Sequence, residues 1–435
     1  MLFSSILATV GLLAVGTEGR YHKRSDGTVI SSRKMPQKRS PSPIVVTDVV
    51  LPLTKKKSTS SNKRRLALHG LLATIGDGDQ TTITSLETGE EFATEVVETG
   101  FTCTSFSTGE KTTEAACDFG PYYTKSSTFS QISGETFSIE YGDGESLTGI
   151  MGTEDVTVAG VEVVGQEIAL VTAADWEGDG TTSGLMGLAY KALTSAYDGS
   201  TQEVYSPIFT KMYSAGDISE DYFSLMILRD TEGDSGYLAF GGVPSITFTQ
   251  NFTSTPIIIT NIDGYPDSYD FYTINIDSIY LKGATVTSSG GTSVEYIIDS
   301  GTTLNYVPTS VATKINAAYS PAATYSDDEG AYVVSCTATP PAVSIDIAGT
   351  LFPINPLDMI LDAGDDTCIT GWMDGGSSDT EDIFILGDVF QKNVVSLFDV
   401  GAGTMQFAGR EFYASDDTVK RSTVQRRKAP RMVKN

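Results

Sequence analysis

The feature that most constrains the fold is a pattern that occurs twice along the chain. An apolar stretch ends in an acid, a Thr or Ser and a Gly at 83–89, and again at 297–301. Each loop is followed further along the chain by two apolar residues and a glycine, first at 185–187 and then at 385–387. We interpret this as a diverged internal duplication, which predicts two halves built on one plan.

Length and composition favour an all-β body. The chain has 435 residues, which suits two lobes of about 100–200 residues each. Glycine and the β-branched residues are plentiful, whereas stretches with helical periodicity are few. This composition is typical of strands joined by turns.

Charge is unevenly distributed along the chain. The chain carries 29 Lys and Arg against 55 Asp and Glu, but thirteen of the basic residues lie in 1–65 and seven in 420–435. The body between these ends is therefore strongly acidic, and its self-repulsion falls when its carboxylates are protonated. We interpret this as adaptation to an acidic medium; the alternative is that the charge serves solubility. Nucleic acid is an unfavourable partner for such a surface.

Histidine is nearly absent from the chain. The two histidines are His22 and His69, so catalytic triads and histidine-rich metal sites lack their usual base and ligand. We therefore expect acid–base chemistry to come from carboxylates, with no metal and no other cofactor.

The four cysteines predict one disulfide in each half of the chain. Four cysteines allow three connectivities. The short separations favour Cys103 with Cys117 and Cys336 with Cys368. Each bridge would contribute about 3 kcal/mol by closing a loop.

The first residues resemble a secretion signal. An apolar run at 2–15 is followed by small residues, which predicts a signal peptide over 1–19 and a secreted protein. The run is short for a membrane span.

Residues 20–65 are basic and polar, and they show no periodicity of a core element. They contain the clusters Lys23-Arg24, Lys38-Arg39 and Lys63-Arg64-Arg65. These clusters predict a pro-segment that is removed by a dibasic-cutting processing protease, with the mature chain starting near Leu66. A solvated linker is the alternative. The tail at 413–435 is also basic and polar, and it carries no signal for a lipid anchor.

Five motifs, in order along the chain, resemble those of the pepsin-family aspartic proteases. They are SSTF at 126–129, YGDG at 141–144, GLMGLAY at 184–190, IIDSGTT at 297–303 and ILGDVF at 385–390. The matches extend over about 66–412. A lone Asp-Ser-Gly occurs by chance, whereas five motifs in the family's order with a duplicated spacing do not.

The resemblance implies a bilobal all-β fold, with an N-terminal lobe at 66–245, a C-terminal lobe at 246–412 and a cleft between them. One carboxylate from each lobe would lie at the cleft floor, and the matching residues are Glu87 and Asp299. Two carboxyl groups that share a proton activate water in such a site, since like charges about 3 Å apart cannot both ionise. The expected substrate is a peptide or protein, and we expect a monomer.

Further residues acquire roles from the same resemblance. Thr88 and Ser300 would lock the two catalytic loops together. Thr302 would touch the substrate backbone or the carboxylate network, and Tyr141 would be the tyrosine of a flap over the cleft. The remaining residues expected at the substrate are Gly142, Asp143, Gly301 and Thr303.

The N-terminal half-site departs from the family pattern. The family has Asp at the position of Glu87, and it has a hydroxyl residue where Glu90 stands. Thr94 or Glu95 falls where the family commonly has a Trp behind the flap tyrosine. The extra methylene of Glu87 moves the carboxylate by more than about 1 Å, and misplacement of that size can cost about 10²-fold in rate. The alternative first acids, Asp77 and Asp79, fall at a hairpin tip in the family.

Two functions remain open from the sequence. One is an acid endopeptidase with reduced or altered activity, and the other is a non-catalytic relative that binds peptides or acts at the cell surface. Asn251 begins a glycosylation sequon. Trp176 and Trp372 have no assigned role.

Overall fold

The computed structural model describes the greater part of the two predicted lobes. It covers residues 30–34, 40–54, 72–77, 80–87, 94–141, 144–178, 180, 182–228, 234–245, 251–262, 268–286, 294–327, 329–364, 366–376 and 384–410. The predicted signal peptide 1–19 and the tail 413–435 lie outside the described residues. Thr88, Glu90, Gly142 and Asp143 do so too.

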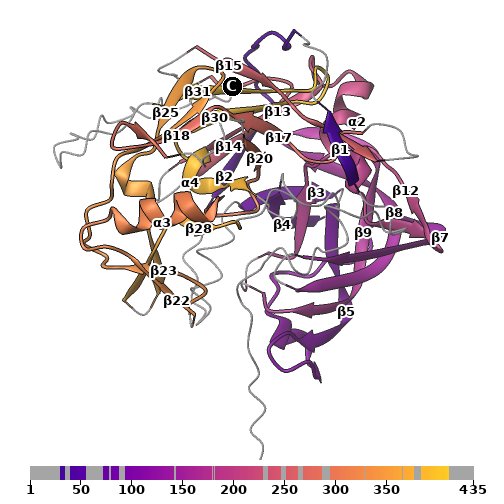
Figure 1. Ribbon diagram of the computed structural model, residues 1–435. Helices are drawn as coiled ribbons and strands as arrows, with labels where there is room; N and C mark the ends of the chain where they lie inside the picture. Colours follow the sequence, from indigo (N-terminus) through magenta and orange to yellow (C-terminus); the bar gives the residue numbers. More distant parts are fainter. Residues whose placement is uncertain are drawn as a thin grey trace, which may run out of the picture.

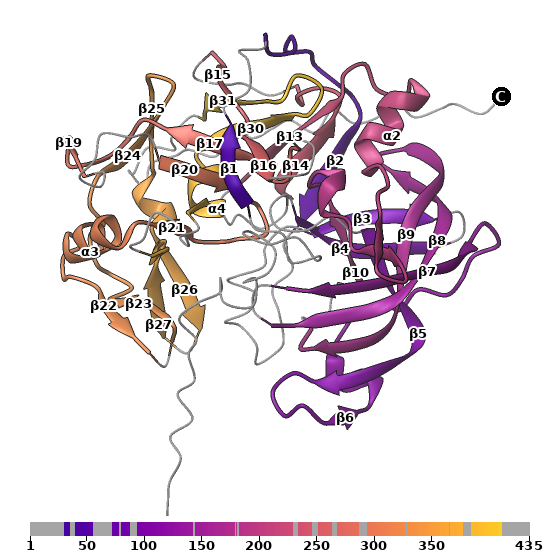
Figure 2. The same ribbon diagram turned by 45° about the vertical axis from the view of Figure 1, so that its right-hand side comes forward.

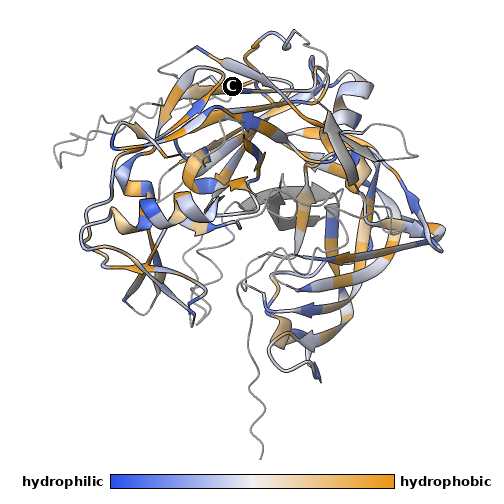
Figure 3. Cartoon of the chain, viewed as in Figure 1, coloured by the Kyte–Doolittle hydropathy of each residue, from blue (hydrophilic) through white to orange (hydrophobic). Residues whose placement is uncertain are grey.

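The chain forms two β-rich lobes joined by a sheet that runs between them (Figure 1). The predicted all-β bilobal fold is confirmed. Apolar and polar residues alternate along many of the strands (Figure 3), as expected where one face of a sheet is buried. Among the described residues, no helix is long and apolar enough to cross a membrane.

The N-terminal lobe consists mainly of long strands that pair with their neighbours in the chain. On β8, alternate residues from Glu154 to Val158 are buried. The strands are β3 (Leu72–Asp77), β4 (Gln80–Glu87), β5 (Thr94–Ser105), β6 (Lys111–Thr112), β7 (Ser130–Glu140), β8 (Ser146–Val158), β9 (Val161–Trp176), β10 (Gly184–Gly187), β11 (Ala196–Asp198) and β12 (Thr201–Glu203).

The strands between the lobes come from both halves of the chain. They are β2 (Val50–Thr54), β13 (Tyr222–Ile227), β14 (Asp234–Phe240), β15 (Thr253–Pro256), β30 (Val394–Asp399) and β31 (Thr404–Gly409). β13 of the first half pairs with β30 of the second, and the rings of Phe223 and Phe398 stack across this pair with centroids 4.5 Å apart. The two lobes therefore share one continuous hydrophobic core.

One expectation from the sequence is wrong. Residues 20–65 were expected to contribute no core element, but β2 lies within this range and pairs with β14 and β3. Leu51 and Leu53 of β2 are buried. Upstream of β2, Ser42 donates from its N–H and its hydroxyl to the carboxylate of Asp399.

The C-terminal lobe is built from three smaller sheets. Figure 2 shows the sheet of β22, β23, β26 and β27 at the outer end of this lobe, opposite β6 of the other lobe. The strands are β17 (Thr273–Ile276), β18 (Ser278–Leu281), β19 (Ala284–Thr285), β20 (Val294–Ile298), β21 (Asn305–Val307), β22 (Thr324–Ser326), β23 (Ala331–Val334), β24 (Val343–Ile347), β25 (Thr350–Pro353), β26 (Ile360–Gly364), β27 (Thr367–Thr370), β28 (Trp372–Asp374) and β29 (Ile385–Leu386). A separate pair joins β1 (Ile30–Lys34) to β16 (Ile259–Ile262).

The helices of the described residues are short. They are α2 (Ile208–Ala215), α3 (Thr309–Ala317) and α4 (Asp388–Gln391), with 3₁₀ turns η1 (Glu114–Cys117), η2 (Lys191–Leu193) and η3 (Pro356–Asp358). Gly216 ends α2 in the left-handed conformation, with φ of 86°, which glycine adopts without strain.

Both predicted disulfides are confirmed. Cys103 is bonded to Cys117, and Cys336 is bonded to Cys368. Asn251 of the sequon is exposed, so the position is accessible, and its glycosylation stays a prediction.

Candidate active site

The best-defined part of the site is the loop that follows β20. Asp299 is fully buried there, and its two carboxylate oxygens accept separate hydrogen bonds. The Gly301 N–H donates to Oδ1 at 2.7 Å, and the Thr302 hydroxyl donates to Oδ2 at 2.5 Å. Of the two roles expected for Thr302, the structure therefore shows the contact with the carboxylate. These two donors fix the orientation of the Asp299 side chain.

Helix α4, from much later in the chain, is hydrogen-bonded to this loop. The backbone N–H groups of Asp388 and Val389, at the start of α4, donate to the carbonyl oxygens of Thr302 and Thr303 at 2.9 and 3.0 Å. Gly387 directly precedes Asp388, and a Cβ at this position would lie 2.2 Å from the carbonyl oxygen of Thr302, so a glycine is needed here. The Ile-Leu-Gly motif thus supplies the close backbone approach that the Asp299 loop needs.

Burial sets the electrostatics of Asp299. Removal from water raises the pKa of its carboxyl group, and the hydrogen bonds from Thr302 and Gly301 oppose part of that increase. The protonated form is consequently favoured over a wider pH range than for an exposed Asp.

The two halves of the duplicated pattern have the same strand pairing beside their acids. β10 runs parallel to β4, with Met186 opposite Leu86 and Gly187 opposite Glu87. β29 runs parallel to β20 in the same way, with Leu386 opposite Ile298. Asp299 follows Ile298 directly, and its N–H donates to the Leu386 carbonyl oxygen at 3.3 Å.

The backbone positions of Glu87 and Asp299 are therefore equivalent in the two halves. Each residue comes directly after the apolar residue that pairs with the middle member of an apolar-apolar-Gly triplet. The side chain of Glu87 and residues 88–93 lie outside the described part. The pairing of the two carboxylates, and the lock between Thr88 and Ser300, stay predictions.

The flap prediction concerns the hairpin of β7 and β8. Tyr141 follows β7, its N–H donates to the Glu145 carbonyl oxygen, and its own carbonyl oxygen accepts from the Gly144 N–H. Gly142 and Asp143 are not among the described residues. The Tyr141 ring meets the Trp176 ring edge-to-face, with centroids 5.5 Å apart.

The structure distinguishes between the two residues that could occupy the position behind the flap tyrosine. Thr94 and Glu95 are both buried in β5. The Tyr141 hydroxyl donates to Oε1 of Glu95 at 2.5 Å. Of these two residues, Glu95 is therefore the one that contacts the Tyr141 hydroxyl.

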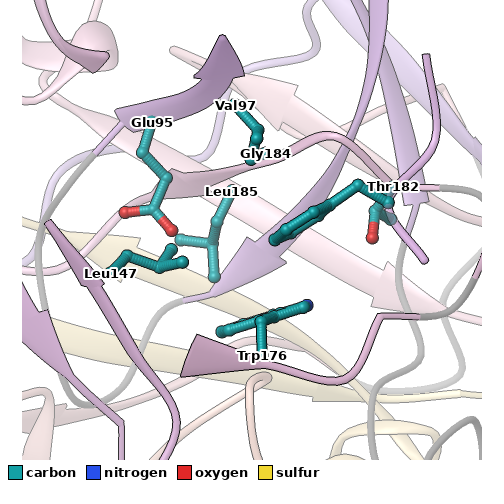
Figure 4. Close-up of a pocket in the computed structure, with 8 residues that line it drawn as sticks. Glu95, Val97, Leu147, Trp176, Thr182, Gly184 and Leu185 are labelled. Carbon is teal, nitrogen blue, oxygen red and sulfur yellow. The ribbon is translucent and has the colours of Figure 1, made fainter. Parts of the chain in front are cut away.

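A small cavity lies beside this contact. Its walls include Glu95, Val97, Leu147, Trp176 and Leu185. Figure 4 shows the Glu95 carboxylate pointing into the space near Leu147 and Leu185, with the Trp176 ring along another wall. Sequence reasoning gave Trp176 no role, and its place at the end of the long segment that forms β9 was the available signal.

The lobes are also connected close to the site. The Tyr272 hydroxyl donates to the carbonyl oxygen of Leu188, just after β10, at 2.6 Å. The Tyr272 ring packs against Tyr190 and Phe398. The hydrogen bond from Tyr272 therefore joins the end of β10, the strand that pairs with Glu87, to the lobe that carries Asp299. Trp372, the other unassigned tryptophan, is fully buried in the core of the C-terminal lobe.

The fold and the Asp299 loop define the class of bilobal aspartic proteases, and comparisons with known proteins agree. The family model for eukaryotic aspartyl proteases matches residues 81–410. The chain belongs to this family.

Named relatives include several endopeptidases. A probable aspartic-type endopeptidase of Aspergillus fumigatus is 45% identical over 348 residues, which is 78% of each chain. Rhizopuspepsin of Rhizopus chinensis is 30% identical over 290 residues, covering 66% of this chain and 67% of the relative. The crystal structure of the aspartic proteinase from Irpex lacteus superposes with a TM-score of 0.64 at 20% identity, covering 84% of this chain and 98% of that one. This last likeness concerns the fold alone.

Proposed function

We propose that this chain is a secreted endopeptidase that hydrolyses peptide bonds in acid, with Asp299 and Glu87 as its carboxylate pair. The observation that carries the proposal is the buried Asp299 carboxyl, held by two donors, at a backbone position equivalent to that of Glu87. Membership of the aspartyl protease family supports it.

The different environments suggest different roles for the two acids. The raised pKa of Asp299 favours its protonated form, so it is the member that donates to the scissile carbonyl oxygen. Glu87 takes a proton from water as the water oxygen bonds to the carbonyl carbon. The gem-diol then collapses: Glu87 returns its proton to the amide nitrogen, the C–N bond breaks, and a hydroxyl proton restores Asp299.

Reduced or altered activity is part of the proposal. The additional methylene of Glu87 displaces the carboxylate base from the position that an Asp would occupy. This displacement should lower the rate by about 10²-fold. The acidic body supports an acidic working range, since carboxylate repulsion weakens as pH falls. Peptides or proteins are the substrates, and the proposed form is a monomer without a cofactor.

The maturation steps belong to the same proposal. A signal peptide over 1–19 and dibasic clusters in 20–65 support secretion and cleavage by a dibasic-cutting protease. Because β2 is part of the inter-lobe sheet, the segment 40–54 belongs to the folded body in this structure.

The decisive experiment is a peptidase assay on the purified secreted protein and three variants. Asp299→Ala should abolish cleavage in acid, whereas Asp217→Ala, at an exposed position after α2, should leave it unchanged. Glu87→Asp should raise the rate by about 10²-fold. No turnover in the wild type together with strong activity in Glu87→Asp would instead identify a non-catalytic, peptide-binding relative.

A further inference from the structure

The cavity beside the flap combines a carboxylate with apolar walls. Glu95 is 2% exposed, and among the described residues that line the cavity it is the acidic one. Val97, Leu147 and Leu185 provide aliphatic surface, and Trp176 provides an aromatic face. A charge surrounded by such walls interacts strongly with an opposite charge, because little water screens it.

The cavity lies next to the proposed catalytic centre. Leu185 lines it and pairs with both Glu95 of β5 and Ser85 of β4. Gly187, two residues further along the same strand, pairs with Glu87, so the two places are about 7 Å apart along β10. A side chain in the cavity would therefore belong to a peptide bound across the carboxylates, close to the bond that is cut.

Size narrows the choice of side chain. The cavity volume is about 30 Å³, room for about two water molecules. An ammonium group with its adjoining methylene is slim enough for this space, whereas an aromatic ring is much larger. The methylene stem of such a side chain can lie along apolar and aromatic walls while its charged end meets the carboxylate.

We infer that this cavity binds the ammonium end of a substrate lysine and that Glu95 determines this specificity. The inference rests on the proposed function, since it requires a peptide in the cleft. Glu95 accepts from the Tyr141 hydroxyl of the flap, so the flap, the carboxylate and the lysine would form one hydrogen-bonded group. A neutral apolar side chain in the same place would offer the Glu95 carboxylate neither a hydrogen-bond donor nor an opposite charge.

The test measures binding rather than turnover. Peptides with a non-cleavable statine centre carry either lysine or norleucine in turn at each position flanking that centre, and their affinities are measured by calorimetry. At one position the wild type should bind the lysine peptide about 10-fold or more tightly than its norleucine counterpart. Glu95→Gln should lose this preference and bind the lysine peptide no more tightly than its norleucine counterpart.

A matched control lies on the same strand. Glu98→Gln changes a half-buried carboxylate of β5 that pairs with Lys125 at 3.2 Å, and it should keep the lysine preference. A cooperative thermal melt of Glu95→Gln shows that this variant is folded.

The contrary outcomes are distinct. Equal affinity for lysine and norleucine peptides at every position in the wild type overturns the lysine assignment and leaves the proposed function standing. A lysine preference that persists in Glu95→Gln overturns the role of Glu95. Failure to bind any of these peptides overturns the inference and the proposed function together.

Discussion

The Tyr141 hydroxyl donates a hydrogen bond to the carboxylate of Glu95 and thereby connects the flap hairpin to β5. The Trp176 ring contacts the Tyr141 ring edge-to-face, so the tyrosine is held by both a polar and an aromatic contact. The orientation of the flap base thus depends on a buried acid.

Removing the hydroxyl should weaken this connection. In Tyr141→Phe the Glu95 carboxylate loses a donor in a buried place, which should lower the free energy of unfolding by about 1–3 kcal/mol. Thermal melting of the purified protein would measure the loss. Tyr213→Phe, at an exposed position of α2, is the control and should melt like the wild type. Equal melting temperatures for the two variants would show that the flap contact adds no stability.

Asp299→Asn should stabilise the protein while abolishing its activity. Burial raises the pKa of Asp299, and the hydrogen bonds from Thr302 and Gly301 offset this in part. A carboxyl group whose pKa rises on folding favours the folded state in acid and disfavours it as pH climbs through the raised pKa. Asparagine cannot ionise, so the gain should be about 2–4 °C in melting temperature near pH 7 and smaller near pH 4. A gain that is larger in acid would contradict this account.

Glu154 of β8 should have the opposite pH dependence. Burial by itself would raise the pKa of Glu154, but hydrogen bonds from Ser126, Thr128, Tyr123 and the Asp155 N–H outweigh it, and the pKa is lowered. The stabilisation from such a group is present above its unfolded pKa and disappears as pH falls through the lowered one.

The test of this second carboxylate is Glu154→Gln. The variant should lose about 1–3 kcal/mol of unfolding free energy near pH 7 and less in strong acid. Urea denaturation at both pH values would measure the difference. Glu162→Gln, at an exposed position of β9, should be neutral at both. A loss that grows in acid would argue against a structural role for the ionised form.

The strand β2 should be necessary for full stability. Leu53 is completely buried between the lobes, so Leu53→Ala should cost about 2–5 kcal/mol. A chain that begins at Leu66 lacks the whole strand and should melt at lower temperature than one that begins at Ser40. Scanning calorimetry of both forms would measure this, and equal melting temperatures would mean that β2 is dispensable.

Local motifs explain what the sequence could predict. Asp299 and its loop were predicted because the donors of the Asp-Ser-Gly-Thr turn lie within three residues of the acid. The disulfides were predicted because each closes a short loop within one lobe. The duplication was visible because both halves use the same apolar-apolar-Gly triplet beside the acid.

Features that depend on distant residues were missed. β2 is a short strand in a basic, polar stretch, and its pairing with β14 joins residues far apart in the chain. The choice between Thr94 and Glu95 depends on which face of β5 points to Tyr141, and counting across the preceding loop does not fix that face. Trp176 lies in a cavity wall together with residues of β5, and it contacts Tyr141. These neighbours are distant in the sequence, so the sequence did not predict the role.

The attachment of residues 42–54 has a consequence for a molecule that is cut. Ser42 is hydrogen-bonded to Asp399, in the C-terminal part of the chain. Strand β2 lies between β14 and β3 in the sheet. Neither disulfide connects this segment to the rest. Cleavage at Lys63-Arg64-Arg65 would therefore produce a two-chain protein whose short chain stays associated in native buffer and separates only in denaturant.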